Sequence, residues 1–161
     1  MTRYKWIKKE VEKGLLIRQV YGVVFSNDGK ILLRTENNKY MLTGGKPERD
    51  ETYEETLKRE YLEELNIEVD NVYYLGYLLV DDEDGTEPYA QVRMIATIKQ
   101  INDARPDTDS GKLYGRFLAN LKNVKGYLDY EEAGNSLIDD AIILAKEKYD
   151  LDDYNEEEYY I

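Results

Sequence analysis

The chain contains neither cysteine nor histidine, and each absence removes a class of chemistry. Without cysteine there are no disulfides, no thiolate nucleophiles and no cysteine-ligated zinc sites. Without histidine there are no Ser-His-Asp triads, no imidazole general bases and no histidine-bound metals. Any catalysis must therefore depend on carboxylates, lysines, arginines and tyrosines, together with a metal ion that carboxylate oxygens bind well.

The chain also lacks long apolar runs and a positive net charge. No segment approaches the roughly 20 apolar residues that cross a bilayer, and residues 1–6 lack the apolar core of a signal peptide, so we expect a cytoplasmic protein without membrane association. Lysine and arginine number 22 against 34 aspartates and glutamates, which leaves a net charge of −12. Because such a chain repels phosphate backbones, we expect no stable nucleic-acid binding, and phosphates must be bound locally by metal ions or a few placed cations.

The length of 161 residues, 42% of them hydrophobic, fits one compact domain that is a monomer or a homodimer. Within residues 1–161 we expect an N-terminal arm, residues 1–14, that is anchored by Trp6, and a loosely held acidic tail, residues 150–161. Hairpins mixed with two separated helices indicate a mixed sheet with helices on its faces. The expected elements are a hairpin of residues 15–25 and 31–33, a short strand at 40–42, a helix at 51–65, strands at 72–80 and 91–98 around an acidic loop at 81–88, a strand within 113–121, and a helix at 137–149 capped by Asn135 and Ser136.

The helix expected at residues 51–65 carries three crowded carboxylates. At about 100° per residue, Glu60, Glu63 and Glu64 lie within one arc that borders the buried stripe of Tyr53, Leu57, Tyr61 and Leu65. Carboxylates so close together repel one another unless a cation lies between them. Mg²⁺ and Mn²⁺ are the cations that such oxygen ligands favour. The glycines at positions 44 and 45 allow the backbone close to a ligand, so a carbonyl there could join the metal ligands.

The spacing of these residues matches a known motif. Gly45, Glu51 and the run Arg-Glu-Tyr-Leu-Glu-Glu-Leu-Asn-Ile at 59–67 resemble the Nudix box, G-x5-E-x7-R-E-U-x-E-E-x-G-U, where U is apolar. Asn66 replaces the last glycine, and asparagine also adopts the left-handed conformation that ends helices. Thr43 stands where many members have proline, which removes no ligand. The order of the expected elements over residues 15–148 also follows that of the family.

The resemblance implies an α/β fold, the Nudix-type α/β/α sandwich with a mixed β-sheet between helices. It also implies a Mg²⁺-dependent (or Mn²⁺-dependent) hydrolase that cleaves a phosphoanhydride bond in a nucleoside diphosphate linked to another moiety. Nucleoside triphosphates, oxidised nucleotides and nucleotide sugars are such substrates. The sequence leaves open which small nucleotide this chain would bind.

By the same resemblance, Glu60, Glu63 and Glu64 bind the metal, with a carbonyl of Gly44 or Gly45. Glu51 and Arg59 orient these ligands and complete the catalytic set with Glu60 and Glu64. The general base is either Glu64 or an acid of the 81–88 loop. The loop candidates are Glu83, Asp84 and Glu87, and the cations that we place near a phosphate are Arg34, Lys46, Arg93 and Arg116.

Two other functions fit the resemblance. A non-catalytic Nudix-fold regulator would bind a nucleotide without cleaving it, but such modules usually lose carboxylates of the box, and this box is intact. A pyrophosphohydrolase acting on the 5′ end of RNA would need a basic strip beside the site, because the net charge is unfavourable. Residues 5–13 are the candidate for that strip.

Overall fold

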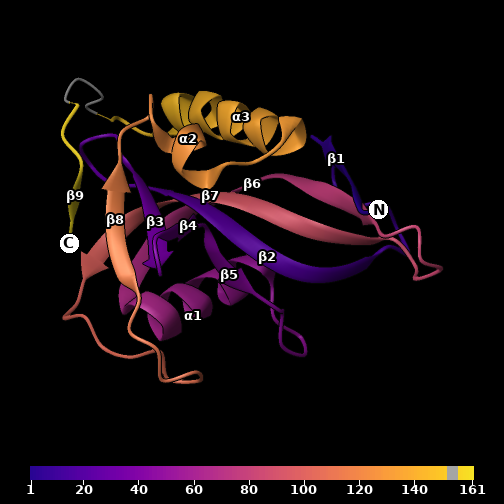
Figure 1. The fold of residues 1–161 in the computed structure, drawn as a ribbon, viewed down its shortest axis with the longest axis horizontal. Coiled ribbons are helices and arrows are strands. Elements are labelled where there is room, and N and C mark those ends of the chain that lie inside the picture. Colours follow the sequence, from indigo (N-terminus) through magenta and orange to yellow (C-terminus); the bar gives the residue numbers. More distant parts are fainter. Residues whose placement is uncertain (152–155) are drawn as a thin grey trace.

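The computed structural model of the chain describes residues 1–151 and 156–161, which form a mixed β-sheet between helices. One face of the sheet is covered by α1 (Tyr53–Leu65), and the other face by α2 (Val124–Leu128) and α3 (Glu132–Lys148) (Figure 1). This arrangement confirms the expected α/β/α sandwich. Among the described helices, none combines the length and the apolar character needed to cross a membrane.

The centre of the sheet is a parallel pair, β2 and β7, whereas the pairs on either side of it are antiparallel. The strands follow the order β1-β6-β7-β2-β3-β8-β9, with β4 on β3 and β5 on β2. Their bounds are β1 (Arg3–Ile7), β2 (Leu16–Phe25), β3 (Ile31–Glu36), β4 (Lys39–Met41), β5 (Thr43–Gly45), β6 (Ile67–Asp81), β7 (Tyr89–Ile101), β8 (Gly115–Ala119) and β9 (Tyr159–Tyr160). The predicted hairpin is confirmed as β2 and β3, although these strands pair only at Phe25 and Ile31 before each turns to another neighbour.

The start of α3 differs from the prediction. The helix begins at Glu132, and neither Asn135 nor Ser136 caps it, because both lie inside the helix. Gly134 is a packing residue: a Cβ atom there would lie 2.3 Å from Cβ of Tyr130. The glycine therefore lets Tyr130 lie against the helix. The five-residue helix α2 was not predicted, since so short a segment has no measurable periodicity.

The N-terminal arm is a strand of the sheet. β1 pairs antiparallel with β6, and its Trp6 donates a hydrogen bond from Nε1 to Oδ2 of Asp140 on α3, at 2.8 Å. A Cβ atom at Gly76 would lie 2.8 Å from the indole, so the glycine makes room for the ring. Trp6 is therefore the anchor that the sequence predicted, and it joins β1 to both β6 and α3.

The C-terminal residues are also bound to the sheet. β9 pairs with β8, and Arg116 donates from Nε to the carbonyl oxygen of Ile161 at 3.0 Å. The carboxylate of Glu158 accepts from the backbone amide of Asn120 at 3.0 Å and from the hydroxyl of Tyr127 at 2.6 Å. The prediction of a loose tail is therefore wrong for residues 156–161, while residues 152–155 lie outside the described part.

Helix α1 lies close to the sheet because β2 carries a glycine beneath it. Leu57 and Tyr61 are fully buried, and the Tyr61 hydroxyl donates to the carbonyl oxygen of Gly22 at 3.0 Å. A Cβ atom at Gly22 would lie 2.7 Å from Cδ1 of Leu57. The N-terminus has a capping box, in which Thr52 and Glu55 bond each other's backbone amides. These contacts fix the distance of α1 from the sheet and the position of its N-terminus, and α1 is the helix that carries the crowded carboxylates.

Helix α1 ends at Asn66, as the sequence predicted. Asn66 has φ 52° and ψ 44°, and its backbone amide bonds the carbonyl oxygens of Leu62 and Tyr61. Its Nδ2 donates to the carbonyl oxygen of Asp103 at 2.9 Å. The residue therefore both ends the helix in the left-handed conformation and ties it to the loop after β7.

We expect Asn66→Val to lower the free energy of unfolding by about 1–3 kcal/mol, because a β-branched residue is strained at positive φ and loses the bond to Asp103. Asn66→Gly relieves the strain but loses the same bond, so its stability should stay within about 1 kcal/mol of the wild type. Urea denaturation of the three proteins measures both changes. Equal stability of Asn66→Val and the wild type would contradict the cap.

Candidate active site

The guanidinium of Arg59 binds four groups between β5 and α1. Its Nε and Nη2 donate to both carboxylate oxygens of Glu51, at 2.7 and 2.9 Å. Nη1 donates to Glu60 at 2.8 Å and to Glu63 at 3.2 Å, and Nη2 also donates to the carbonyl oxygen of Lys46 at 3.0 Å. Arg59 thus brings three carboxylates and the end of β5 together.

Glu51 joins the loop before α1 to the first turns of the helix. Besides Arg59, its Oε1 accepts from the hydroxyl of Thr56 at 2.9 Å and from the backbone amide of Glu48 at 2.8 Å. The hydrogen bonds from Arg59 lower the pKa of Glu51 to about 2, against the opposing effect of burial. Glu51 is therefore ionised at neutral pH and serves as a fixed acceptor.

Glu60 lies directly against the backbone of β5. A Cβ atom at Gly45 would lie 2.4 Å from Oε1 of Glu60, so a glycine is needed for the carboxylate to reach the strand. Gly44 must also be a glycine, because a Cβ atom there would lie 2.1 Å from the carbonyl oxygen of Val20 on β2. Burial raises the pKa of Glu60; Arg59 opposes this effect, and the charge of Glu63 adds to it.

Glu64 is paired with Arg34 of β3. Arg34 Nη1 lies 2.5 Å from Glu64 Oε1, and the two side chains are only 14% and 11% exposed. Burial raises the pKa of Glu64 to about 7; Arg34 opposes this effect, and the charges of Glu60 and Asp107 add to it. The second oxygen, Oε2, is buried and has no hydrogen-bond partner among the described residues. Glu64 therefore presents one unbonded oxygen beside two other acids.

Asp107 is a further acid of the site that sequence reasoning missed. It lies on the loop between β7 and β8, which passes beside α1 (Figure 1), and it is only 7% exposed. Its charge raises the pKa of both Glu60 and Glu64, so it faces them. No local pattern distinguishes it from other loop acids. Only the course of the chain from β7 to β8 brings it to the helix.

The predicted loop bases lie elsewhere. Glu83, Asp84 and Glu87 lie at the tip connecting β6 and β7, at the end of the sheet away from α1 (Figure 1). Glu83 is paired there with Arg3 of β1 at 2.9 Å. The structure therefore does not bring these three acids to the glutamates of α1, and Asp107 is the loop acid beside them.

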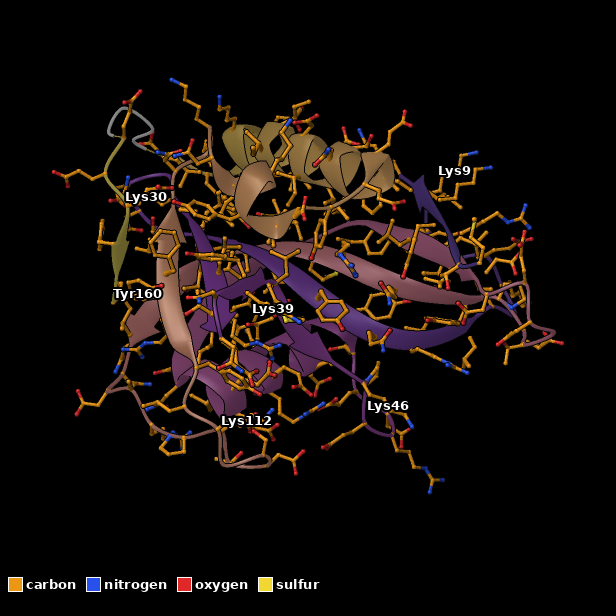
Figure 2. The ribbon with its side chains drawn as sticks, viewed as in Figure 1. Lys9, Lys30, Lys39, Lys46, Lys112 and Tyr160 are labelled. Carbon is orange, nitrogen blue, oxygen red and sulfur yellow. The ribbon has the colours of Figure 1, made fainter. Side chains whose placement is uncertain are left out.

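The four predicted phosphate-binding cations have different surroundings. Arg34 is beside Glu64, whereas Lys46 is exposed on the loop that follows β5 (Figure 2). Arg116 is buried and donates to the carbonyl oxygens of Leu65, Asn102 and Ile161 at 2.7–3.1 Å, so it holds backbone segments together. Arg93 lies on the other face of the sheet.

A cavity of about 450 Å³ lies on the α3 face, next to β4. Arg93 lines it and is 4% exposed, and its guanidinium carbon lies 4.6 Å from the centroid of the Tyr21 ring. Met41 also lines the cavity, and its sulfur lies 3.1 Å from Nη2 of Arg34. The cavity therefore adjoins the pair of Arg34 and Glu64.

The acids of the site have the donor chemistry of a magnesium or manganese site, although the described part of the chain contains no group of three acids already arranged around a metal position. Their oxygens are instead bonded to Arg59 and Arg34. Two observations favour a metal: Oε2 of Glu64 is buried without a partner, and Gly45 leaves the backbone of β5 open to Glu60. The oxygen-only donors suit a hard divalent cation.

Comparisons with known proteins agree with this architecture. The family model described as NUDIX domain matches residues 15–142. The fold is similar to that of the Bacillus subtilis pyrophosphohydrolase BsRppH, with 19% identity, a TM-score of 0.67, and coverage of 91% of this chain and 92% of that chain. It is also similar to a MutT protein of Bacillus halodurans (19% identity, TM-score 0.60, 80% and 82% coverage) and to the Ap4A hydrolase of C. elegans (16%, 0.52, 81% and 98%). No curated protein sequence matches the chain.

The raised pKa of Glu64 predicts a stability change with pH. The folded protein holds a proton on Glu64 up to a pKa of about 7, whereas the unfolded chain releases it near 4.5. Stability therefore falls as pH rises from about 4.5 to about 7. Relative to Glu64→Gln, the wild type should lose roughly 1–2 kcal/mol of unfolding free energy over this range, measured by urea denaturation in chelator. A constant difference between the two proteins would contradict the raised pKa.

Proposed function

The chain belongs to the Nudix family, and we propose that it is a pyrophosphohydrolase that cleaves a phosphoanhydride bond of a small nucleotide with the help of Mg²⁺ or Mn²⁺. The substrate is a nucleoside diphosphate linked to another moiety. One observation carries the proposal: three glutamates of α1 and Asp107 lie close together, with Glu60 against Gly45 of β5, and within the described residues the cations paired with these glutamates are Arg59 and Arg34. Acids crowded in this way suit a cation and a phosphorylated substrate.

In this proposal Glu60, Glu63 and Glu64 bind the metal, together with a backbone carbonyl of Gly44 or Gly45. The unpartnered Oε2 of Glu64 and the contact between Glu60 and Gly45 support this assignment. When bound, a divalent cation neutralises charge on the phosphates and lowers the pKa of an attacking water. The protein itself has to position these groups, which needs neither histidine nor cysteine.

Arg59 and Glu51 position the metal-binding glutamates. The two bonds from Arg59 to Glu51 fix the guanidinium plane, and the remaining donors reach Glu60 and Glu63. Lysine could not replace this planar fork, because an ammonium group has no fixed two-pronged geometry. We therefore assign Arg59 to the orientation of ligands.

Two acids are candidates for the general base. Glu64 is the candidate on α1, because its buried Oε2 has no hydrogen-bond partner among the described residues. Asp107 is the alternative from a loop. Either would take a proton from the attacking water. If Glu64 is the base, its protonation weakens the pair with Arg34, which could then bind a phosphate oxygen.

The charge distribution favours a small nucleotide over an RNA end. Lys8, in the basic segment, is paired with Asp140 of α3 at 3.5 Å. The carbonyl oxygen of Lys9 accepts from the hydroxyl of Tyr74, which stacks on Tyr53 in the first turn of α1. The basic segment of residues 5–13 therefore lies by the start of α1, whereas an RNA substrate would need a basic strip beside Glu60, Glu63 and Glu64.

We expect activity to require a divalent metal, because four acids cannot bind a phosphorylated substrate without added positive charge. The assay is release of phosphate or pyrophosphate from nucleoside triphosphates, oxidised nucleotides, ADP-ribose, nucleotide sugars and dinucleoside polyphosphates. Mg²⁺ should support turnover of at least one of these, and excess chelator should abolish it. Full turnover in chelator would overturn the metal requirement, and binding without turnover would favour the regulator.

Charge removal separates the metal site from a merely acidic surface. Glu64→Gln keeps the shape of the side chain but removes its charge, so turnover should fall at least about 10²-fold. Glu55→Gln is the matched control: Glu55 lies on the same helix and its amide equivalent can keep the capping bond to Thr52, so turnover should be unchanged. An active Glu64→Gln enzyme, or a Glu55→Gln enzyme with the same loss, would place the site on the wrong face of α1.

A further inference from the structure

The guanidinium of Arg93 is buried without an acidic partner among the described residues. Its Nη1 and Nη2 make only long hydrogen bonds, to the carbonyl oxygen of Val92 at 3.4 Å and to Oε1 of Gln91 at 3.3 Å, and its Nε has none. Burial of an unpaired charge costs several kcal/mol. The ring of Tyr21 offsets only part of this cost. Such a group is expected where a ligand supplies the missing acceptors.

The cavity next to Arg93 has the size and lining of a nucleoside site. Its volume of about 450 Å³ lies within the usual range for small-molecule sites. Tyr21 and Tyr130 line it, and the guanidinium of Arg93 lies over the ring of Tyr21. Gly134 leaves space for Tyr130, since a Cβ atom at position 134 would collide with it. The cavity therefore has aromatic side chains in its walls and one buried group of hydrogen-bond donors.

The cavity is oriented toward the phosphate-cleaving site. Met41, on its wall, contacts Arg34, which is paired with Glu64. Tyr21 lies opposite Gly44 in the pairing of β2 with β5. Arg93 lines this cavity on the α3 face of the sheet, whereas the glutamates lie on α1, which covers the opposite face (Figure 1). A nucleotide with its phosphates at the glutamates would therefore place its base, and not its phosphates, near Arg93.

The acids at the cavity also oppose a phosphate there. Asp129 and Glu131 line it near the start of α3. Their negative charges would repel a phosphate group, whereas a neutral base is tolerated. The part of the ligand that reaches Arg93 must therefore be uncharged and rich in acceptors.

We propose that this cavity binds the nucleobase and that Arg93 selects a 6-oxopurine, guanine or hypoxanthine, over adenine. This inference rests on the proposed pyrophosphohydrolase function. A guanidinium carries only donors, and guanine presents two adjacent acceptors, O6 and N7, that match its fork. Adenine presents an amino group in place of O6, so one donor of Arg93 would face another donor. Pyrimidines lack the O6 and N7 pair.

The test compares kcat/KM for GTP, ITP, ATP and CTP with Mg²⁺. The values of kcat/KM for GTP and ITP should be at least about 10-fold higher than those for ATP and CTP. This is the lower end of the discrimination expected from one bidentate contact. The analogue 7-deaza-GTP, which lacks the N7 acceptor, should lose about 10-fold relative to GTP. Equal values for GTP and ATP would overturn the inference while leaving the proposed hydrolase function intact.

Variants assign the preference to Arg93. Arg93→Met should lower kcat/KM for GTP to the value for ATP, mainly by raising KM. In this variant kcat/KM should be the same for GTP and 7-deaza-GTP. The matched control is Arg18→Met, because Arg18 also lies over a tyrosine ring, that of Tyr89 at 4.5 Å, but outside the cavity. Arg18→Met should keep the full preference for GTP over ATP. A preference that survives in Arg93→Met would overturn the role of Arg93.

Binding provides a readout that does not depend on catalysis. Calorimetry of the metal-free protein with GMP and AMP should show at least about 10-fold tighter binding of GMP. Absence of turnover for every nucleotide would overturn the proposed function. In that case tighter binding of GMP would still support the base preference, and equal affinity for GMP and AMP would overturn it.

Discussion

The arrangement of the site depends on mutual repulsion among its acids, which one guanidinium relieves. Glu51, Glu60 and Glu63 would not share so small a space without the donors of Arg59. The same side chain also bonds the backbone at Lys46, so it holds the end of β5 next to α1. The hydrogen bonds of Arg59 therefore both reduce the repulsion among the glutamates and hold α1, β5 and the loop between them in place.

Close approach of backbone and carboxylate is the second requirement, and glycines provide it. Gly45 leaves space for Glu60, and Gly22 leaves space for Leu57 beneath the helix. A Cβ atom at either position would collide with Glu60 or Leu57, so the two glycines determine how near α1 lies to the sheet. Arg34 then reaches Glu64 from β3 with a contact of 2.5 Å, an interaction between elements that are far apart in sequence.

Local patterns predicted much of this structure, and distant contacts explain where they failed. The helical stripe of Leu57 and Tyr61 and the left-handed Asn66 follow from residues within one helix, and the structure confirms them. Asp107 was missed because its place depends on the course of a loop that no short pattern encodes. Glu83 was chosen because it is acidic and in a loop, but β6 and β7 are long enough to carry it away from the site (Figure 1).

The parallel pairing of β2 with β7 has a consequence for folding. Val20 lies opposite Val92, so the centre of the sheet cannot close until most of the chain has been made. Parallel pairs of this kind need a long crossover, and contacts between distant residues slow folding. Here α1 lies within that crossover, between the two strands. During synthesis on the ribosome the acidic helix would therefore emerge before the strand that completes the sheet beside it, and its glutamates would remain in water until β7 arrives.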